Sequence, residues 1–138
     1  MNAAVTGEVT AQLTSDEDVV RVRKMVRDQL VALGFSLIDQ TKMVTAASEL
    51  ARNTLRYGGG GRAELVVLNN VGRRGLSISF IDHGPGIEDI AKALTDGYTT
   101  GGGMGLGLSG ARRLADEFHI ESSPGNGTRV TITKWKPF

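Results

Sequence analysis

The sequence has no cysteine, only two histidines and few aromatic residues. Without thiols, disulfide bonds and thiolate metal sites are excluded, and His83 and His119 are too few for a His-rich zinc site. The formal net charge is +1 at pH 7, so no strong electrostatic field favours nucleic acid or a membrane surface. We therefore expect neither nucleic-acid binding nor membrane binding.

Long hydrophobic runs are also missing. The first residues, M-N-A-A-V-T-G-E-V, lack the basic stretch and apolar run of a signal peptide, and no apolar stretch approaches membrane-spanning length. With 138 residues, 40% of them hydrophobic and 22% charged, the chain is typical of a globular protein. We expect one cytoplasmic domain over residues 1–138, and a monomer, because nothing in the sequence requires a dimer.

Glycine, in contrast, is abundant, at 19 residues. The glycines are clustered, which indicates specific backbone requirements rather than low complexity. The clusters are Gly58–Gly61, Gly84 and Gly86, Gly101–Gly103, and Gly105, Gly107 and Gly110.

Hydrophobic periodicity and turn residues predict the order of the elements. Ser15 or Thr14 caps the first helix and Gly34 ends it, whereas Ser36 caps the second. The expected elements are a strand at the sheet edge over 5–13, helices over 16–33 and 36–57, strands over 63–70 and 75–82 joined by a turn at 71–74, one or two helical turns within 88–94, a helix over 105–118, and strands over 119–122 and 128–134. This order predicts an α+β fold with a mixed or antiparallel sheet and helices on one face.

Glu49 and Asn53 lie four residues apart on the second helix, so both project from one face. That face lies opposite the apolar stripe of the helix. Glu49 is a carboxylate able to take a proton, and Asn53 is an amide able to hold a metal ion or a phosphate oxygen. The alternative is an ordinary solvated helix face.

The string G-L-G-L-S-G at 105–110 matches G-x-G-x-x-G, but it follows a polar glycine loop instead of a strand, which argues against a dinucleotide-binding fold. No Walker A string and no H-R-D string of ordinary protein kinases occurs. Glycines ahead of a helix do let backbone N–H groups approach an anion, which indicates a phosphate site. A flexible entry to the helix is the alternative.

Asp82 ends a predicted strand and begins the string D-H-G-P-G-I. A carboxylate at a strand end can accept a hydrogen bond from the exocyclic amine of adenine, which favours ATP over GTP. Gly84 and Gly86 would let a flat base approach the backbone. A simple turn, with Pro85 fixing φ, is the alternative.

Taken together, these stretches resemble the GHKL superfamily of ATP-binding domains, and the resemblance extends from about Leu13 to Trp135. Each motif is weak alone, but four in this order are specific. They are Glu49 and Asn53 as the N box; Asp82, Gly84 and Gly86 as the G1 box; Gly103, Gly105 and Gly107 as the G2 box; and Gly127–Thr128 before the last strand.

The resemblance implies a Bergerat-type α/β sandwich, with a mostly antiparallel sheet covered on one face by three helices, and it implies ATP and Mg²⁺ as cofactors. Asn53 would coordinate Mg²⁺, and Glu49 would act as general base toward a serine hydroxyl. Asp82 would hold the adenine amine beside Gly86, and Thr128 would support Asp82 or a bound water. The triphosphate would be wrapped by Gly103, Met104, Gly105, Leu106 and Gly107.

Within the superfamily, the segments A-A-S-E-L-A-R-N and D-G-Y-T-T-G-G-G-M-G-L-G-L are similar to those of small bacterial RsbT-type switch kinases, which are related to anti-sigma-factor kinases. The resemblance implies a protein serine/threonine kinase. Such a kinase phosphorylates a STAS-domain antagonist and, once released, activates a PP2C-type phosphatase. One alternative is an anti-sigma factor that also binds a sigma factor, and another is a nucleotide-gated binding module without phosphotransfer.

The stretch Tyr98–Gly102 departs from some anti-sigma relatives, which carry an arginine there that can reach the γ-phosphate. Here it has no basic residue, which favours the switch kinase over the anti-sigma factor. Arg52 and Arg56 are candidates to neutralise the γ-phosphate by their helix positions. A solvated charge or a surface ion pair is the alternative for both.

Overall fold

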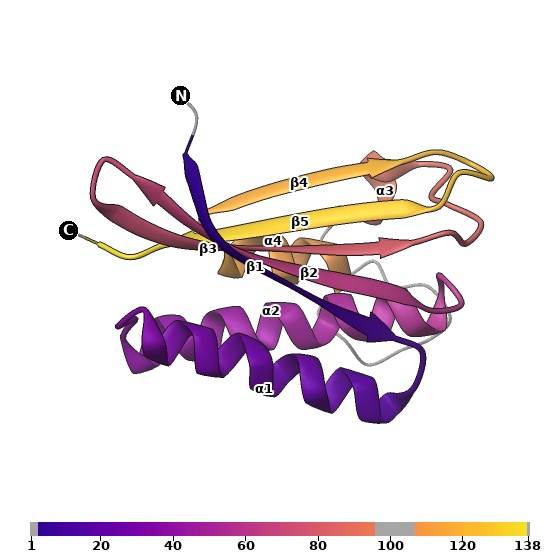
Figure 1. Ribbon diagram of the computed structural model, residues 1–138. Helices are drawn as coiled ribbons and strands as arrows, with labels where there is room; N and C mark the ends of the chain where they lie inside the picture. The colour runs from indigo at the N-terminus through magenta and orange to yellow at the C-terminus, as the bar shows by residue number, and fades with distance from the viewer. Residues whose placement is uncertain (1–2, 96–106, 138) are drawn as a thin grey trace.

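The computed structural model describes residues 3–95 and 107–137. Figure 1 shows a layer of helices packed against one face of a five-stranded sheet. The elements are β1 (Ala4–Leu13), α1 (Asp16–Ala32), α2 (Leu37–Arg56), β2 (Gly61–Asn70), β3 (Arg73–Asp82), α3 (Ile90–Ala93), α4 (Gly107–Leu114), β4 (Glu117–Ser122) and β5 (Thr128–Trp135).

The strand order is β1-β2-β3-β5-β4, and every pairing in this sheet is antiparallel. The α+β class, the order of the elements and the position of β1 at an edge are therefore confirmed. α1, α2 and α4 lie against the sheet, and the short α3 follows β3 (Figure 1). Apolar side chains of these three helices form one core with those of the strands.

The β2–β3 hairpin differs from the predicted one, because its turn has two residues, not four. Val71 and Gly72 have φ values of +53° and +80°, the combination found in tight hairpin turns, and β3 starts two residues earlier than predicted as a result. The Asn69 side chain accepts a hydrogen bond from the Gly72 N–H at 2.9 Å, which stabilises the turn.

The helix predicted over 105–118 was wrong at its C-terminal end, because α4 stops at Leu114. The Asp116 N–H already bonds to the Thr133 carbonyl at 3.0 Å, so the chain has joined the sheet at that point. Phe118 fits the helical spacing from Ala111, but it equally fits a strand period with Ile120, and both side chains pack against the core. Residues 105 and 106 lie outside the described residues.

The corner between β1 and α1 is fixed by Asp18, which is buried at the start of the helix. Its carboxylate accepts hydrogen bonds from the Thr14 N–H at 2.9 Å and from the Thr14 hydroxyl at 3.0 Å, and it pairs with Arg21. The backbone hydrogen bond from Thr14 lowers the pKa of Asp18 most, and the hydroxyl and Arg21 add to the effect. Of the two predicted caps, Ser15 is the one that caps the helix, by accepting a hydrogen bond from the Asp18 N–H.

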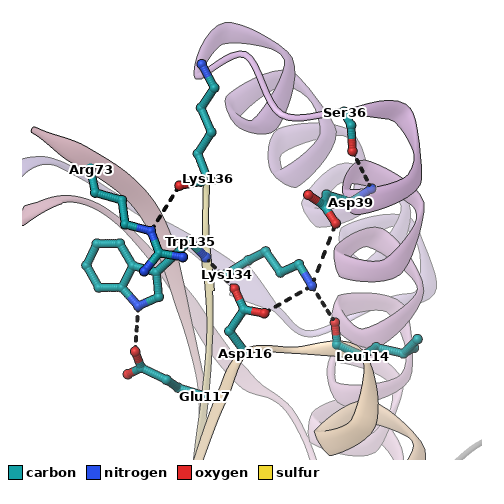
Figure 2. Close-up of polar contacts among 9 residues, drawn as sticks. All are labelled: Ser36, Asp39, Arg73, Leu114, Asp116, Glu117, Lys134, Trp135 and Lys136. Carbon is teal, nitrogen blue, oxygen red and sulfur yellow. Dashed lines mark hydrogen bonds and ion pairs between the residues drawn. The ribbon is translucent and has the colours of Figure 1, made fainter. Parts of the chain in front are cut away.

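A buried lysine ties three elements together at one end of the sheet (Figure 2). The Lys134 ammonium lies 3.3 Å from Asp116 and 3.7 Å from Asp39, the latter in the first turn of α2. It also donates to the carbonyl of Leu114, the last residue of α4, at 3.4 Å. Lys134 therefore fixes the C-terminal end of α4 against α2 and β5, while the other end of α4 starts at Gly107.

Among the described residues, none of the helices combines the length and the hydropathy needed to cross a membrane.

We expect Lys134→Met to lower the free energy of unfolding by about 1–3 kcal/mol, because it leaves the Leu114 carbonyl and two carboxylates without their cation. Denaturant unfolding of the whole chain measures the loss. The matched control is Lys42→Met at an exposed position of α2, which should change stability by less than about 0.5 kcal/mol. Equal stability of the two variants would show that the Lys134 contacts contribute nothing.

Candidate functional site

A cavity of about 1370 Å³ opens between the C-terminal half of α2 and the ends of β3 and β5. The segment from Pro85 to Ile90 and the start of α4 form its other sides. Its lining mixes two kinds of surface, charged side chains along α2 and apolar side chains from several elements. The apolar members include Leu50, Phe80, Ile87, Ile90, Leu108 and Val130.

Glu49 and Asn53 both line this cavity, on the floor formed by α2. Glu49 is only 8% exposed, so the alternative of a solvated helix face does not hold for it. Its Oε1 accepts a hydrogen bond from Arg52 Nη2 at 3.0 Å, and Arg52 lines the same cavity. The side chain of Asn53 is half-buried and has no hydrogen-bond partner within the described part of the chain.

Asp82 lies at the end of β3, in the opposite wall, and is 9% exposed. Its Oδ1 accepts a hydrogen bond from the Gly84 N–H at 2.9 Å, which fixes the carboxylate. No described residue donates to Oδ2, so this oxygen can accept a hydrogen bond from a ligand. Gly58, just after α2, packs directly on the carboxylate, and a Cβ atom there would lie 2.3 Å from Asp82 Cγ. Position 58 therefore has to be glycine for Asp82 to sit where it does.

Gly86 lines the cavity, whereas Gly84 does not and acts through its hydrogen bond to Asp82. The backbone at Gly86 has φ +78°, and a Cβ there would lie 2.0 Å from the Ser123 carbonyl oxygen. The loop after β3 and the β4–β5 turn can therefore meet here only if residue 86 has no side chain.

Sequence reasoning missed Ser122, which links three segments around the cavity. Its hydroxyl donates to the Gly127 carbonyl at 2.8 Å and accepts from the Ile87 N–H at 2.8 Å. The Thr128 hydroxyl lies 2.8 Å away, and because the single proton of Ser122 is already used, Thr128 is the donor. A serine opposite Thr128 at the end of a strand was the available signal, but the strand register had to be known first.

Thr128 pairs with Asp82 across β3 and β5, so its position beside Asp82 follows from the sheet register. Gly107 also lines the cavity, with φ +68° at the first residue of α4. The other predicted phosphate-binding residues, Gly103, Met104, Gly105 and Leu106, lie outside the described residues.

The cavity thus offers separate chemistries at its two ends. A free carboxylate oxygen, beside a backbone that approaches closely and an apolar wall, suits a flat base that carries an amine. The floor of α2 offers an amide oxygen, a carboxylate and guanidinium groups, which suit a metal ion and phosphates. The donor set therefore fits a purine nucleotide better than it fits a purely apolar ligand.

Comparisons with known proteins agree with this chemistry. The model of the histidine kinase-, DNA gyrase B- and HSP90-like ATPases matches residues 38–137. The chain is 42% identical over 124 residues to the serine/threonine-protein kinase RsbT of Bacillus subtilis, with 90% of this chain and 93% of that protein covered. It is 34% identical over 95 residues to an anti-sigma F factor of Thermoanaerobacter sp., with 66% of each covered.

Two solved structures share the fold. One contains the RsbU and RsbW domains of a Mycobacterium tuberculosis protein, with a TM-score of 0.64 and 22% identity; the match covers 96% of this chain and 34% of that longer chain. The other is the SiaB–SiaC complex of Pseudomonas aeruginosa, with a TM-score of 0.54, 14% identity, and 95% and 90% of the two chains covered.

The chain therefore belongs to the histidine kinase-, DNA gyrase B- and HSP90-like ATPases, the GHKL superfamily, and to the RsbT-type protein serine/threonine kinases within it. ATP use follows from this membership.

We expect Ser122→Ala to loosen the wall beside Asp82, because the Ile87 N–H and the Gly127 carbonyl both lose their partner. The loss of stability should be about 1–3 kcal/mol. Hydrogen exchange of the Ile87 amide should be faster in the variant than in the wild type. Ser123→Ala, at the next and exposed position, is the matched control and should leave Ile87 protected. Unchanged protection in Ser122→Ala would contradict the role given to Ser122.

Proposed function

We propose that this kinase transfers the γ-phosphate of ATP to a serine or threonine of a STAS-domain antagonist, and that once released it activates a PP2C-type phosphatase. The observation that carries the proposal is the placement of a buried carboxylate, Glu49, one helical turn from Asn53 on the floor of a cavity that has Asp82 in its far wall. The 42% identity to RsbT supports the assignment to a partner-switching kinase.

In this proposal Asp82 accepts a hydrogen bond from the adenine amine through Oδ2, while Gly84 holds Oδ1 in place. Guanine carries a carbonyl oxygen where adenine carries its exocyclic amine. This oxygen has no hydrogen to donate, so two acceptors would face each other in a complex with GTP. Gly86 lets the base lie against the backbone, and Thr128 contributes through its hydrogen bond to Ser122. The wall around Asp82 thus selects adenine and sets the direction in which the phosphates extend.

In the proposal, Asn53 would hold Mg²⁺ beside the phosphates. An amide oxygen is a ligand that Mg²⁺ accepts, and the Asn53 side chain lines the cavity without a competing partner among the described residues. Mg²⁺ held there would supply positive charge that offsets the negative charge of the phosphates during transfer. Gly107 lies at the cavity beside the start of α4, where backbone N–H groups can face a phosphate.

Glu49 acts as the general base. It takes the proton of the incoming hydroxyl, the hydroxyl oxygen forms the new bond to the γ-phosphorus, and the bond to the β–γ bridging oxygen breaks to release ADP. Burial keeps the carboxylate away from bulk water, so that Oε2, to which no described residue donates, is available to the substrate hydroxyl. The residue contributes orientation and proton transfer, and the protein surface outside the cavity supplies the binding of the antagonist.

The second candidate function is an anti-sigma factor that also binds a sigma factor, because the 34% identity to an anti-sigma F factor supports it. Binding of the purified chain to purified sigma subunits distinguishes the two functions. Under the first candidate no sigma subunit binds, whereas a stable complex in the presence of ATP would favour the second.

The test of the proposed reaction is Glu49→Gln, assayed with ATP–Mg²⁺ and a purified STAS protein. We expect ATP binding to persist while phosphorylation falls by about a hundredfold or more, the usual contribution of a general base. Asn53→Ala should instead weaken the Mg²⁺-dependent part of ATP binding.

Thr45→Ala is the matched control, since Thr45 is exposed one turn before Glu49 on the same helix. It should change neither binding nor transfer. Full phosphorylation by Glu49→Gln would remove Glu49 as the base. A wild type that binds ATP but labels no STAS protein would favour the binding module without phosphotransfer.

A further inference from the structure

Arg52 forms an ion pair with the carboxylate of Glu49, and both side chains line the same cavity. We propose that Arg52 is a positioning residue that exchanges partners, pairing with Glu49 in the absence of nucleotide and moving to the γ-phosphate when ATP binds. ATP, but not ADP, would thereby free Glu49 Oε1, the carboxylate oxygen that accepts the hydrogen bond from Arg52. This inference rests on the proposed function.

The pair is built for exchange by its geometry. Among residues 3–95 and 107–137, Arg52 Nη2 donates to one oxygen, Glu49 Oε1, at 3.0 Å, and the pair spans a single helical turn. The Arg52 side chain is 35% exposed, whereas that of Glu49 is 11% exposed. The carboxylate is thus held in place by its burial, and the longer arginine side chain is the partner free to move.

The energies favour the exchange. Ion pairs one turn apart on a partly exposed helix are weak, so breaking this one changes an equilibrium by only about twofold. A terminal phosphate carries more negative charge than a carboxylate, and its oxygens match the planar fork of a guanidinium. A γ-phosphate within reach of Arg52 therefore competes effectively with Glu49.

The phosphates should reach Arg52 because of the direction in which α2 runs. Asp82 contacts Gly58 just beyond the helix, while Glu49 lies more than two turns back along it. With a rise of 1.5 Å per residue, the two positions are roughly 13 Å apart along the axis. A nucleotide whose base lies at Asp82 therefore extends toward Arg56 first, and its terminal phosphate approaches Asn53, Arg52 and Glu49.

Calorimetric binding of Mg²⁺–ATP and Mg²⁺–ADP to four versions of the full chain tests the exchange. The versions are the wild type, Arg52→Gln, Glu49→Gln and the double variant. Arg52→Gln should weaken ATP binding by about tenfold and leave ADP binding within about twofold, because only the terminal phosphate loses a charged hydrogen bond. Glu49→Gln should strengthen ATP binding by about twofold, because Arg52 is released.

The double variant separates release of Arg52 from simple removal of a negative charge. Under the proposal, Glu49→Gln has little effect on ATP affinity once Arg52 is gone. The same strengthening with and without Arg52 would overturn the exchange, as would equal weakening of ATP and ADP by Arg52→Gln. Arg23→Gln, which removes an exposed charge on α1, is the control and should change neither affinity. A wild type that binds neither nucleotide would overturn the proposed function itself.

Discussion

The packing of α2 between α1, the sheet and α4 is the constraint on which the rest of the structure depends (Figure 1). From Met43 to Ala51 almost every residue of this helix is buried, including the polar Ser48 and Glu49. A buried charge is costly unless it is paired, and Arg52 supplies the pairing one turn away. The helix that forms the centre of the core thus also carries the polar floor of the cavity.

The two ends of the helical layer are held by different interactions. At one end the Lys134 ammonium joins Asp39, Asp116 and the last carbonyl of α4, so the C-terminal end of α4 is fixed. At the other end Gly107 opens onto the cavity. The wall opposite α2 is held by the hydroxyl of Ser122, which joins the end of β4 to the loop after β3 and to the β4–β5 turn. Hydrogen bonds and ion pairs thus fix the elements around the cavity while the cavity itself stays open, an arrangement that suits a protein that binds and releases a nucleotide.

Much of the fold could be predicted from local signals. Ser15 and Ser36 cap their helices through hydrogen bonds to backbone N–H groups, and Gly34 ends α1 with φ +83°. Local signals failed where the apolar residues fit both the helical period and the strand period. Phe118 satisfied both a helix and a strand, and only its pairing with Ile132 in the sheet decides between them.

In the candidate site too, features set by spacing along the chain could be predicted, whereas contacts between distant segments could not. Glu49 and Asn53 share a helix face, so their proximity could be predicted from spacing, and the structure brings Asp82, Gly86 and Thr128 to the same cavity. The roles of these residues, and those of residues 103–106, stay predictions. An ion pair was one of the alternatives for Arg52, and its partner Glu49 lies three residues away on the same helix. The links made by Ser122 could not be predicted, because they depend on register between distant strands.

The most direct test of an adenine site at Asp82 is the selectivity of this site for ATP over GTP. Equilibrium binding of Mg²⁺–ATP and Mg²⁺–GTP should be measured for the wild type and for Asp82→Asn. If adenine lies against Asp82, the wild type should bind ATP at least about a hundredfold more tightly than GTP, because a site that accepts a hydrogen bond rejects a ligand that cannot donate one. Asp82→Asn should lose most of this preference. Equal binding of ATP and GTP by the wild type would contradict the placement of adenine against Asp82.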